Sequence, residues 1–339
     1  MLDRFFDAFR SGLERLLLLW LVLLCAVAFY WPRWAAAVWP SGPPDPFVAG
    51  KPWLGLLIAV TMLAVGSLLP RDEIRQVFRR WPTVLGGTAI QYGSMPLLGY
   101  GLGRLFGLEG PWMIGIVMVG CVPGAMASNV LTLIARGNVS YSVSLTTSAT
   151  LLSPLVVPST LWLLLGRHAE FPTLQVAAEL GWMVVAPVVI GHLLSRSVPA
   201  WQASARRGGA ILANLTILWI IAVVVALNRE NLAQLNTTLL AALAAVNLGG
   251  YLAGCLGGRL MRLDRPMRRA LVMEIGMQNA GLGATLATVL FADQPAAALP
   301  AAVYTFGCMF TGTIIARAWA EWDRRAEKKR ASRASSVCP

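Results

Sequence analysis

Residues 121–129 read CVPGAMASN and lie within an apolar stretch that extends from residue 112 to residue 134. Pro123 removes a backbone N–H donor and Gly124 adds backbone freedom, so a helix formed by this stretch is expected to break here. Ser128 and Asn129 follow directly and bring polar side chains to the break. A break beside polar side chains, in a segment long enough to span a bilayer, predicts a functional site inside a membrane.

A second stretch, residues 274–283, reads EIGMQNAGLG and has the same features within the apolar segment 270–292. Its three glycines weaken the helix around a carboxylate and two amides. Glu274 is the most informative of these side chains, because an acidic residue inside a membrane is costly and is usually retained for function. The structural alternative is that Glu274 forms an ion pair with Arg268 or Arg269.

The composition supports a membrane protein built from helices. Of the 339 residues 57% are hydrophobic and only 13% are charged, whereas soluble proteins carry about 25% charged residues. The mean hydropathy is +0.64. We therefore predict an all-α integral membrane protein with ten transmembrane helices, at about residues 14–31, 53–69, 83–105, 112–134, 139–165, 174–195, 209–227, 235–258, 270–292 and 299–319.

The net charge of +12 is interpreted as membrane topology and not as a sign of nucleic-acid binding. When the loops are assigned alternately to the two sides, 23 of the 28 Lys and Arg residues fall on the side that holds the N-terminus. The positive-inside rule makes that side cytoplasmic. We predict a multi-pass protein of the inner (plasma) membrane with both termini cytoplasmic. The first apolar segment is expected to be retained, although Ala26-Val27-Ala28 resembles a signal-peptide cleavage site.

The ten predicted spans divide into two sets of five, residues 1–166 and 167–320. Five is odd, so the second set has the opposite orientation, and inverted repeats of this kind are typical of secondary transporters. The fourth span of each set contains the break, and we expect helices 4 and 9 to cross at their breaks. Residues 321–339 are predicted to form a basic cytoplasmic tail that is disordered and contacts anionic lipid.

The polar residues around the predicted crossing are mainly oxygen donors. They are Gln91, Ser128, Asn129, Ser142, Thr146, Glu274, Gln278 and Asn279. Neutral oxygens with one carboxylate suit a hard monovalent cation, so sodium is the ion we expect. The N-terminus of the half-helix after each break favours an anion. A cation and an anion could therefore bind side by side.

The two motifs resemble the bile acid:sodium symporter family. The resemblance is carried by Pro123-Gly124-x-x-Ala127-Ser128-Asn129-Val130, by Ala135-Arg136-Gly137-Asn138-Val139, by Ser142 with Thr146, and by Glu274-x-Gly276-Met277-Gln278-Asn279-x-Gly281. It extends over essentially all ten spans. It implies a core domain of spans three to five and eight to ten, and a panel domain of spans one, two, six and seven.

The resemblance also implies the roles of individual residues. One sodium ion would be bound by Ser128, Asn129, Ser142, Thr146 and Glu274. A second would be bound by Gln91, Glu274 and Gln278 with the backbone carbonyls of Ile275 and Met277. The substrate would lie near Asn279, between core and panel. Met126 stands where relatives often have a small polar residue and Cys308 where some have histidine, so the pocket is expected to be less polar than theirs. The resemblance implies a substrate that is bile-acid-like or a smaller carboxylate such as pantoate or a keto or hydroxy acid.

The predicted function is a sodium-coupled symporter of an organic anion that works by alternating access. A carrier coupled to protons through Glu274 is the alternative. An enzyme is not expected, because the sequence contains no P-loop, HExxH or GxSxG motif. The expected partners are the anion, two sodium ions and the lipid bilayer, and nothing indicates a protein partner or a further cofactor.

Overall fold

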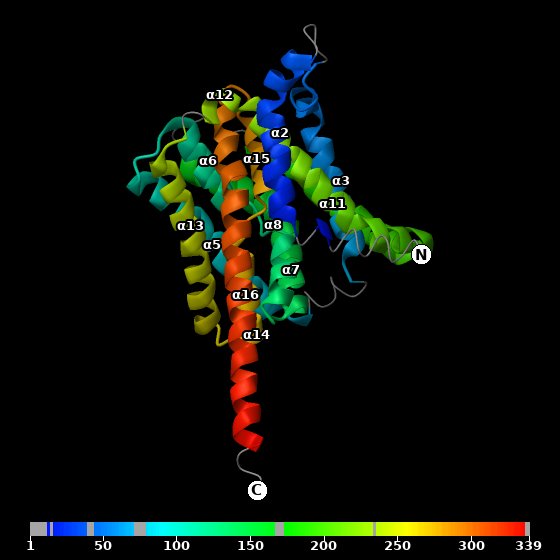
Figure 1. Cartoon of the computed structure of the whole chain (residues 1–339), viewed down its shortest axis with the longest axis vertical. Coiled ribbons are helices and arrows are strands. Elements are labelled where there is room, and N and C mark those ends of the chain that lie inside the picture. The colour runs from blue at the N-terminus through cyan, green and yellow to red at the C-terminus, as the bar shows by residue number, and fades with distance from the viewer. Residues whose placement is uncertain are drawn as a thin grey trace.

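The computed structural model describes residues 12–13, 16–38, 44–70, 79–166, 173–232 and 235–335, and the regular elements in these ranges are helices (Figure 1). Within this part of the chain, seven helices are long and apolar enough to cross a membrane. The protein is thus an all-helical, multi-pass membrane protein, as predicted. Several basic residues used to predict the topology lie outside the described ranges, namely Arg4, Arg10, Arg15, Arg71, Arg75 and Arg167.

The first half of the chain forms helices at each predicted span. They are α2 (Leu17–Val38), the 3₁₀ turn η1 (Val48–Trp53) leading into α3 (Leu54–Leu68), α5 (Trp81–Leu105), α6 (Gly110–Cys121), α7 (Ala127–Ile134) and α8 (Val139–Leu165). Prolines in the first turns of α5 and α6 suit a position whose N–H has no partner in the helix. Asn138 caps α8 by accepting a hydrogen bond of 3.0 Å from the N–H of Tyr141.

The second half follows the same order. It contains α9 (Thr173–Leu180), a π-helical turn η2 (Gly181–Val185), α10 (Ala186–Ser197), α11 (Pro199–Leu227), the short α12 (Arg229–Leu232), α13 (Thr237–Leu260), α14 (Arg265–Gly276), α15 (Ala280–Leu290), the 3₁₀ turn η3 (Pro295–Ala298) and α16 (Leu299–Ser335). Asn236 caps α13 and Asp264 caps α14, each through its side-chain oxygen.

Both predicted helix breaks are confirmed. The fourth apolar segment is divided between α6, which ends at Cys121, and α7, which begins at Ala127. The ninth is divided between α14, which ends at Gly276, and α15, which begins at Ala280. In each case the interruption falls on the residues that combine helix-weakening Pro or Gly with polar side chains.

Helix packing brings the broken helices together at the centre of one group. The helix α14 packs against α13, α7 and α8, and α5 packs against α6, α13 and α8. On the other side of the molecule, α3 packs against α10 and α11, and α11 packs against α2. The broken helices are therefore surrounded by other helices, which is the condition for unwound backbone at membrane depth.

The two largest differences from the predicted boundaries lie at the start of α11 and in the C-terminal segment. The helix α11 begins at Pro199 and not near residue 209, because Pro199 supplies its first turn and no helix-breaking residue follows until Gly208. Its first turn is also fastened to α3, since Trp201 Nε1 donates a hydrogen bond of 3.0 Å to Ser67 Oγ.

The second error concerns the C-terminal segment. Residues 321–335 were expected to be disordered, but α16 continues through them to Ser335. Figure 1 shows this extension projecting beyond all the other labelled helices. The segment is rich in Ala, Glu and Arg, which favour a helix, and Glu321 forms ion pairs with Arg324 and Arg325 one turn later.

Candidate ion and substrate site

The two helix breaks lie side by side and pair through their backbones. Gly124 and Gln278 form an antiparallel β-bridge. The N–H of Ala125 donates to the carbonyl of Met277 at 2.7 Å, and the N–H of Asn279 donates to the carbonyl of Pro123 at 2.8 Å. Each break thereby satisfies backbone groups that the other has lost from its helix. We call residues 122–126 and 277–279 together the crossover.

Glu274 lies in the last turn of α14, directly before the crossover, and is fully buried. Its Oε2 accepts hydrogen bonds from Ser128 Oγ at 2.6 Å and from Thr146 Oγ1 at 2.8 Å. Its Oε1 has no hydrogen-bond partner in the described part of the chain. Glu274 therefore joins α14 to α7 and α8.

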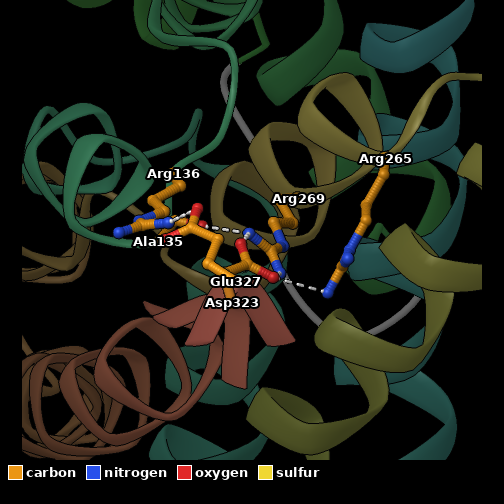
Figure 2. Close-up of polar contacts among 6 residues, drawn as sticks. All are labelled: Ala135, Arg136, Arg265, Arg269, Asp323 and Glu327. Atoms are coloured by element: carbon orange, nitrogen blue, oxygen red, sulfur yellow. Dashed lines mark hydrogen bonds and ion pairs between the residues drawn. The ribbon is translucent and has the colours of Figure 1, made fainter. Parts of the chain in front are cut away.

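The alternative structural role of Glu274, an ion pair with Arg268 or Arg269, is not formed. The two oxygens of Glu274 have the hydroxyl partners just described or none. Arg269 instead binds Asp323 on α16 with two hydrogen bonds of 2.6 and 3.0 Å (Figure 2).

The remaining residues of the first predicted sodium site lie around this carboxylate. Thr146 Oγ1 also lies 3.1 Å from the carbonyl oxygen of Ser142. The Ser142 hydroxyl lies 3.3 Å from Thr132 Oγ1 and so faces α7. Asn129 follows Ser128 on α7, and its Oδ1 has no partner among the described residues. The structure thus brings Ser128, Thr146 and Glu274 into direct contact, with Asn129 and Ser142 on the same two helices.

The second predicted set is also buried. Gln91 on α5 is 1% exposed, and neither its Oε1 nor its Nε2 has a partner in the described part of the chain. Gln278 in the crossover donates through Nε2 to the carbonyl of Ile275 at 2.7 Å, while its Oε1 lacks a partner. The carbonyl of Met277 accepts the Ala125 N–H, which leaves one lone pair for another partner.

These residues fit a hard cation. Among the predicted ion ligands, four buried side-chain oxygens lack a hydrogen-bond donor from the described residues, and they are Glu274 Oε1, Gln91 Oε1, Asn129 Oδ1 and Gln278 Oε1. A buried acceptor without a partner costs about 1–3 kcal/mol. Oxygen atoms of one carboxylate and several amides are the donors that sodium-like hard ions prefer.

A cavity of about 200 Å³ lies next to Asn129 and Thr146. It separates α7 and α8 from α3 and α10, and its lining consists of Val65, Leu68, Leu69, Pro70, Met126, Asn129, Val143, Thr146, Thr147, Thr150 and Val188. Met126, which we predicted to contact substrate, is part of this lining. The cavity is thus mainly apolar, with hydroxyls and one amide on the side of α7 and α8.

Asn279 and Cys308, the other two residues predicted to contact substrate, are placed elsewhere. Asn279 Oδ1 accepts a hydrogen bond of 3.1 Å from the N–H of Leu282 and caps α15. Cys308 is 2% exposed on α16, and its Sγ donates to the carbonyl of Thr305 at 3.5 Å. Neither residue lines the cavity beside Met126.

The residues that hold the end of α14 were not predicted from the sequence. Asn247 Nδ2 and Tyr304 Oη both donate to the carbonyl of Gly276, at 2.8 and 2.9 Å. Thr311 Oγ1 in turn donates to Asn247 Oδ1 at 2.7 Å. A sequence signal was available, because Asn247 is an amide in the middle of the apolar segment 235–258, and such a residue needs a partner on another helix.

The fold and the site define a class of protein. A multi-pass helical membrane protein with a buried, oxygen-lined site where two broken helices meet has the arrangement of a secondary transporter. The chain belongs to the sodium bile acid symporter family, whose model matches residues 55–235. This is a family of transporters, so the protein is not an enzyme.

Individual relatives are similar over most of their length. The chain is 31% identical over 319 residues to the uncharacterised sodium-dependent transporter YocS of Bacillus subtilis, covering 94% of each chain. It is 27% identical to the probable chloroplastic sodium/metabolite cotransporter BASS1 of Oryza sativa, over 88% of this chain and 71% of the relative. It is 26% identical to the hepatic sodium/bile acid cotransporter of Rattus norvegicus, over 71% and 68% respectively.

Proposed function

We propose that the protein is a sodium-coupled symporter of an organic anion, either bile-acid-like or a smaller carboxylate such as pantoate or a keto or hydroxy acid. The observation that carries the proposal is Glu274. It is a fully buried carboxylate with one oxygen held by Ser128 and Thr146 and the other without a donor among the described residues. A cation at that oxygen would compensate the buried charge, and the names of all three relatives include sodium.

The proposed ion ligands form two overlapping sets that share Glu274. The first set is Ser128, Asn129, Ser142, Thr146 and Glu274. The second set is Gln91, Glu274 and Gln278 with the carbonyls of Ile275 and Met277. The four ligand oxygens that lack a donor among the described residues are divided between these sets, which supports a role for both. A single carboxylate shared by two sites fits monovalent ions, because two divalent ions would leave a large uncompensated charge.

The proposed topology has ten crossings. The seven long apolar helices are joined by α5 and by the broken pairs α6/α7 and α14/α15. Residues 1–166 and 167–320 then form inverted repeats, with both termini on the cytoplasmic side of the inner membrane. The core consists of α5 to α8 and α13 to α16, and the panel consists of α2, α3 and α9 to α11. The end of α16 extends into the cytoplasm.

In this proposal, sodium binding and substrate binding are coupled by side chains that contact both the ion and the substrate. Asn129 and Thr146 belong to the first proposed ion set and also line the cavity between core and panel. A substrate carboxylate in that cavity meets the hydroxyls of α8 and the N-terminal end of α7, whose dipole favours an anion. Ion binding fixes Asn129 and Thr146 and so prepares the surface that the substrate contacts. The core then moves against the panel to expose the cavity to the other side.

The energy available from such a cycle is sufficient for accumulation. Two sodium ions with one monovalent anion move one net charge, which is worth about 2.3 kcal/mol per 100 mV. A tenfold sodium gradient adds about 1.4 kcal/mol per ion. The sum of about 5 kcal/mol corresponds to nearly four decades of accumulation.

The proposal is tested by the thermal stability of the purified protein in sodium and in potassium. A ligand that binds only the folded state stabilises it by about 2.7 kcal/mol at a hundred times its Kd. We expect a sodium-specific rise in transition temperature for the wild type and none for Glu274→Ala. If saturating sodium has no effect on the wild type, sodium coupling is refuted, and uptake driven by a pH gradient in sodium-free buffer would then support the proton-coupled alternative.

A further inference from the structure

A partly buried ionic cluster joins the projecting part of α16 to both half-helices that carry the proposed ion ligands (Figure 2). Arg269 on α14 donates to both carboxylate oxygens of Asp323 on α16. The same guanidinium donates to the carbonyl of Ala135 at the end of α7, at 2.7 Å. One arginine thus connects three helices.

The geometry of this cluster differs from that of an ordinary surface ion pair. The Arg269 side chain is only 6% exposed and that of Asp323 is 16% exposed. Arg265 adds a second contact to Asp323 at 2.8 Å, and Trp319 lies 5.4 Å from the Arg269 guanidinium. An arginine that binds a carboxylate with two parallel hydrogen bonds is held in a fixed orientation.

The contact between Arg269 and Ala135 lies at the opposite end of α7 from the ion site. Ser128 and Ala135 are seven residues apart, or about 10 Å along a helix, and Arg269 and Glu274 are about 7.5 Å apart on α14. Side chains therefore join α7 and α14 at two points, Ser128 with Glu274 near the crossover and Arg269 with the Ala135 carbonyl at the far end. At the far end the backbone also contributes, because the N–H of Asn138 donates to the carbonyl of Pro266 at 2.9 Å. The Arg269 contact adds to that backbone bond, and together they fix the far end of α7 against α14 more firmly than the backbone bond alone.

We propose that Asp323 is a positioning residue for the ion site. By holding Arg269 against the Ala135 carbonyl, it keeps α7 and α14 at the separation at which Ser128 and Glu274 meet. This inference rests on the proposed sodium-coupled function, and it gives the cytoplasmic extension of α16 a direct effect on sodium affinity. Without Asp323, the Arg269 side chain loses its fixed orientation, the far contact weakens, and the ion ligands on α7 and α14 move relative to one another.

The test is sodium binding to the purified full-length protein, measured with radioactive sodium at one temperature. Asp323→Asn removes the charge while keeping the size, and we expect the sodium half-saturation concentration to rise about threefold to tenfold, which lies within the range of indirect effects through packed elements. Asp323→Glu keeps the charge and is expected to restore most of the affinity. Glu327→Gln is the matched control, because Glu327 lies one turn further along α16, is 64% exposed, and pairs with the exposed Arg136.

The outcomes separate a positioning role from a merely structural one. A purely structural role would lower the transition temperature in sodium-free buffer and leave the half-saturation concentration unchanged. A value for Asp323→Asn within twofold of the wild type therefore overturns the inference, as does an equal rise in Glu327→Gln. If Asp323→Asn does not fold, the Arg269→Lys variant tests the same inference. The lysine ammonium cannot reproduce the two parallel hydrogen bonds of the arginine guanidinium, so the sodium half-saturation concentration of this variant must rise. If the wild type itself binds no sodium, the proposed function is refuted, and this inference is refuted with it. If the wild type binds sodium and Asp323→Asn binds it equally well, only the role of Asp323 is refuted.

Discussion

Replacing Gly124 by alanine should abolish sodium binding, because Gly124 lies directly against Glu274. A Cβ placed on Gly124 would be 2.5 Å from Cδ of Glu274 and closer still to Oε1. Ordinary contact begins at 3.4 Å, so the carboxyl carbon must retreat by about 0.9 Å. The backbone of Gly124 cannot retreat instead, since it is paired with Gln278 across the crossover.

The loss of stability expected for Gly124→Ala follows from the two hydrogen bonds that hold the Glu274 carboxylate. A movement of about 0.9 Å lengthens bonds of 2.6 and 2.8 Å beyond the normal range. Hydrogen bonds to charged groups contribute about 1.5–3 kcal/mol each. We expect Gly124→Ala to lower the free energy of unfolding by at least about 3 kcal/mol and to displace an oxygen of both proposed ion sets.

The assay is the sodium titration of thermal stability, with Gly283→Ala as the matched control. Gly283 lies in α15, where an added Cβ would meet Ala301 Cβ at an ordinary 3.4 Å. The control should keep the wild-type sodium response, and the helix should gain from the better propensity of alanine. A Gly124→Ala protein with the wild-type sodium response would refute the argument that the Glu274 carboxylate is the centre of the ion site.

Two further variants probe the surroundings of the site. Gly66→Ala places a Cβ 2.7 Å from the Cα and carbonyl carbon of Val188 and closer still to its carbonyl oxygen. Backbone atoms cannot move as a side chain can, so the contact between α3 and α10 should open. We expect slower transport with unchanged sodium affinity, and a raised sodium half-saturation would contradict this. Tyr304→Phe removes one of the two donors to the Gly276 carbonyl and should lower the free energy of unfolding by about 1 kcal/mol. Thermal unfolding in sodium-free buffer measures this free energy, and an unchanged value would mean that the hydrogen bond from Tyr304 does not stabilise the protein.

The helices and their breaks were predictable because each depends on local sequence. An apolar run long enough to span a bilayer identifies a helix regardless of its neighbours. Pro123 with Gly124, and Gly276 before Gln278, similarly mark the interruptions without any knowledge of tertiary contacts. The predicted boundaries of α11 and α16 were wrong because hydropathy shows only where the apolar part of a helix begins or ends. The helix itself can continue beyond the apolar part. Pro199 begins α11, and charged residues continue α16.

The partners within the site were less predictable, since they depend on how distant segments meet. Glu274 was identifiable as a residue that needed compensation, but its hydroxyl partner Ser128 is 146 residues away in sequence. Arg269 was considered as a possible partner for Glu274, but it donates a hydrogen bond to Asp323 instead. Sequence position alone could not choose between these arrangements, because residue spacing on one helix says nothing about which faces of other helices lie opposite.

The pairing of the two breaks also has a consequence for how the protein is made. The unwound residues of the first half hydrogen-bond to Met277 and Asn279, which are synthesised about 150 residues later. Until then, the backbone groups around Pro123 lack the partners that membrane depth requires. The first broken segment must therefore wait in water, in the translocation machinery or as a continuous but strained helix. Completion of the crossover is thus a late step in biogenesis, and a chain that ends before residue 277 has neither the paired crossover nor the complete set of proposed ion ligands.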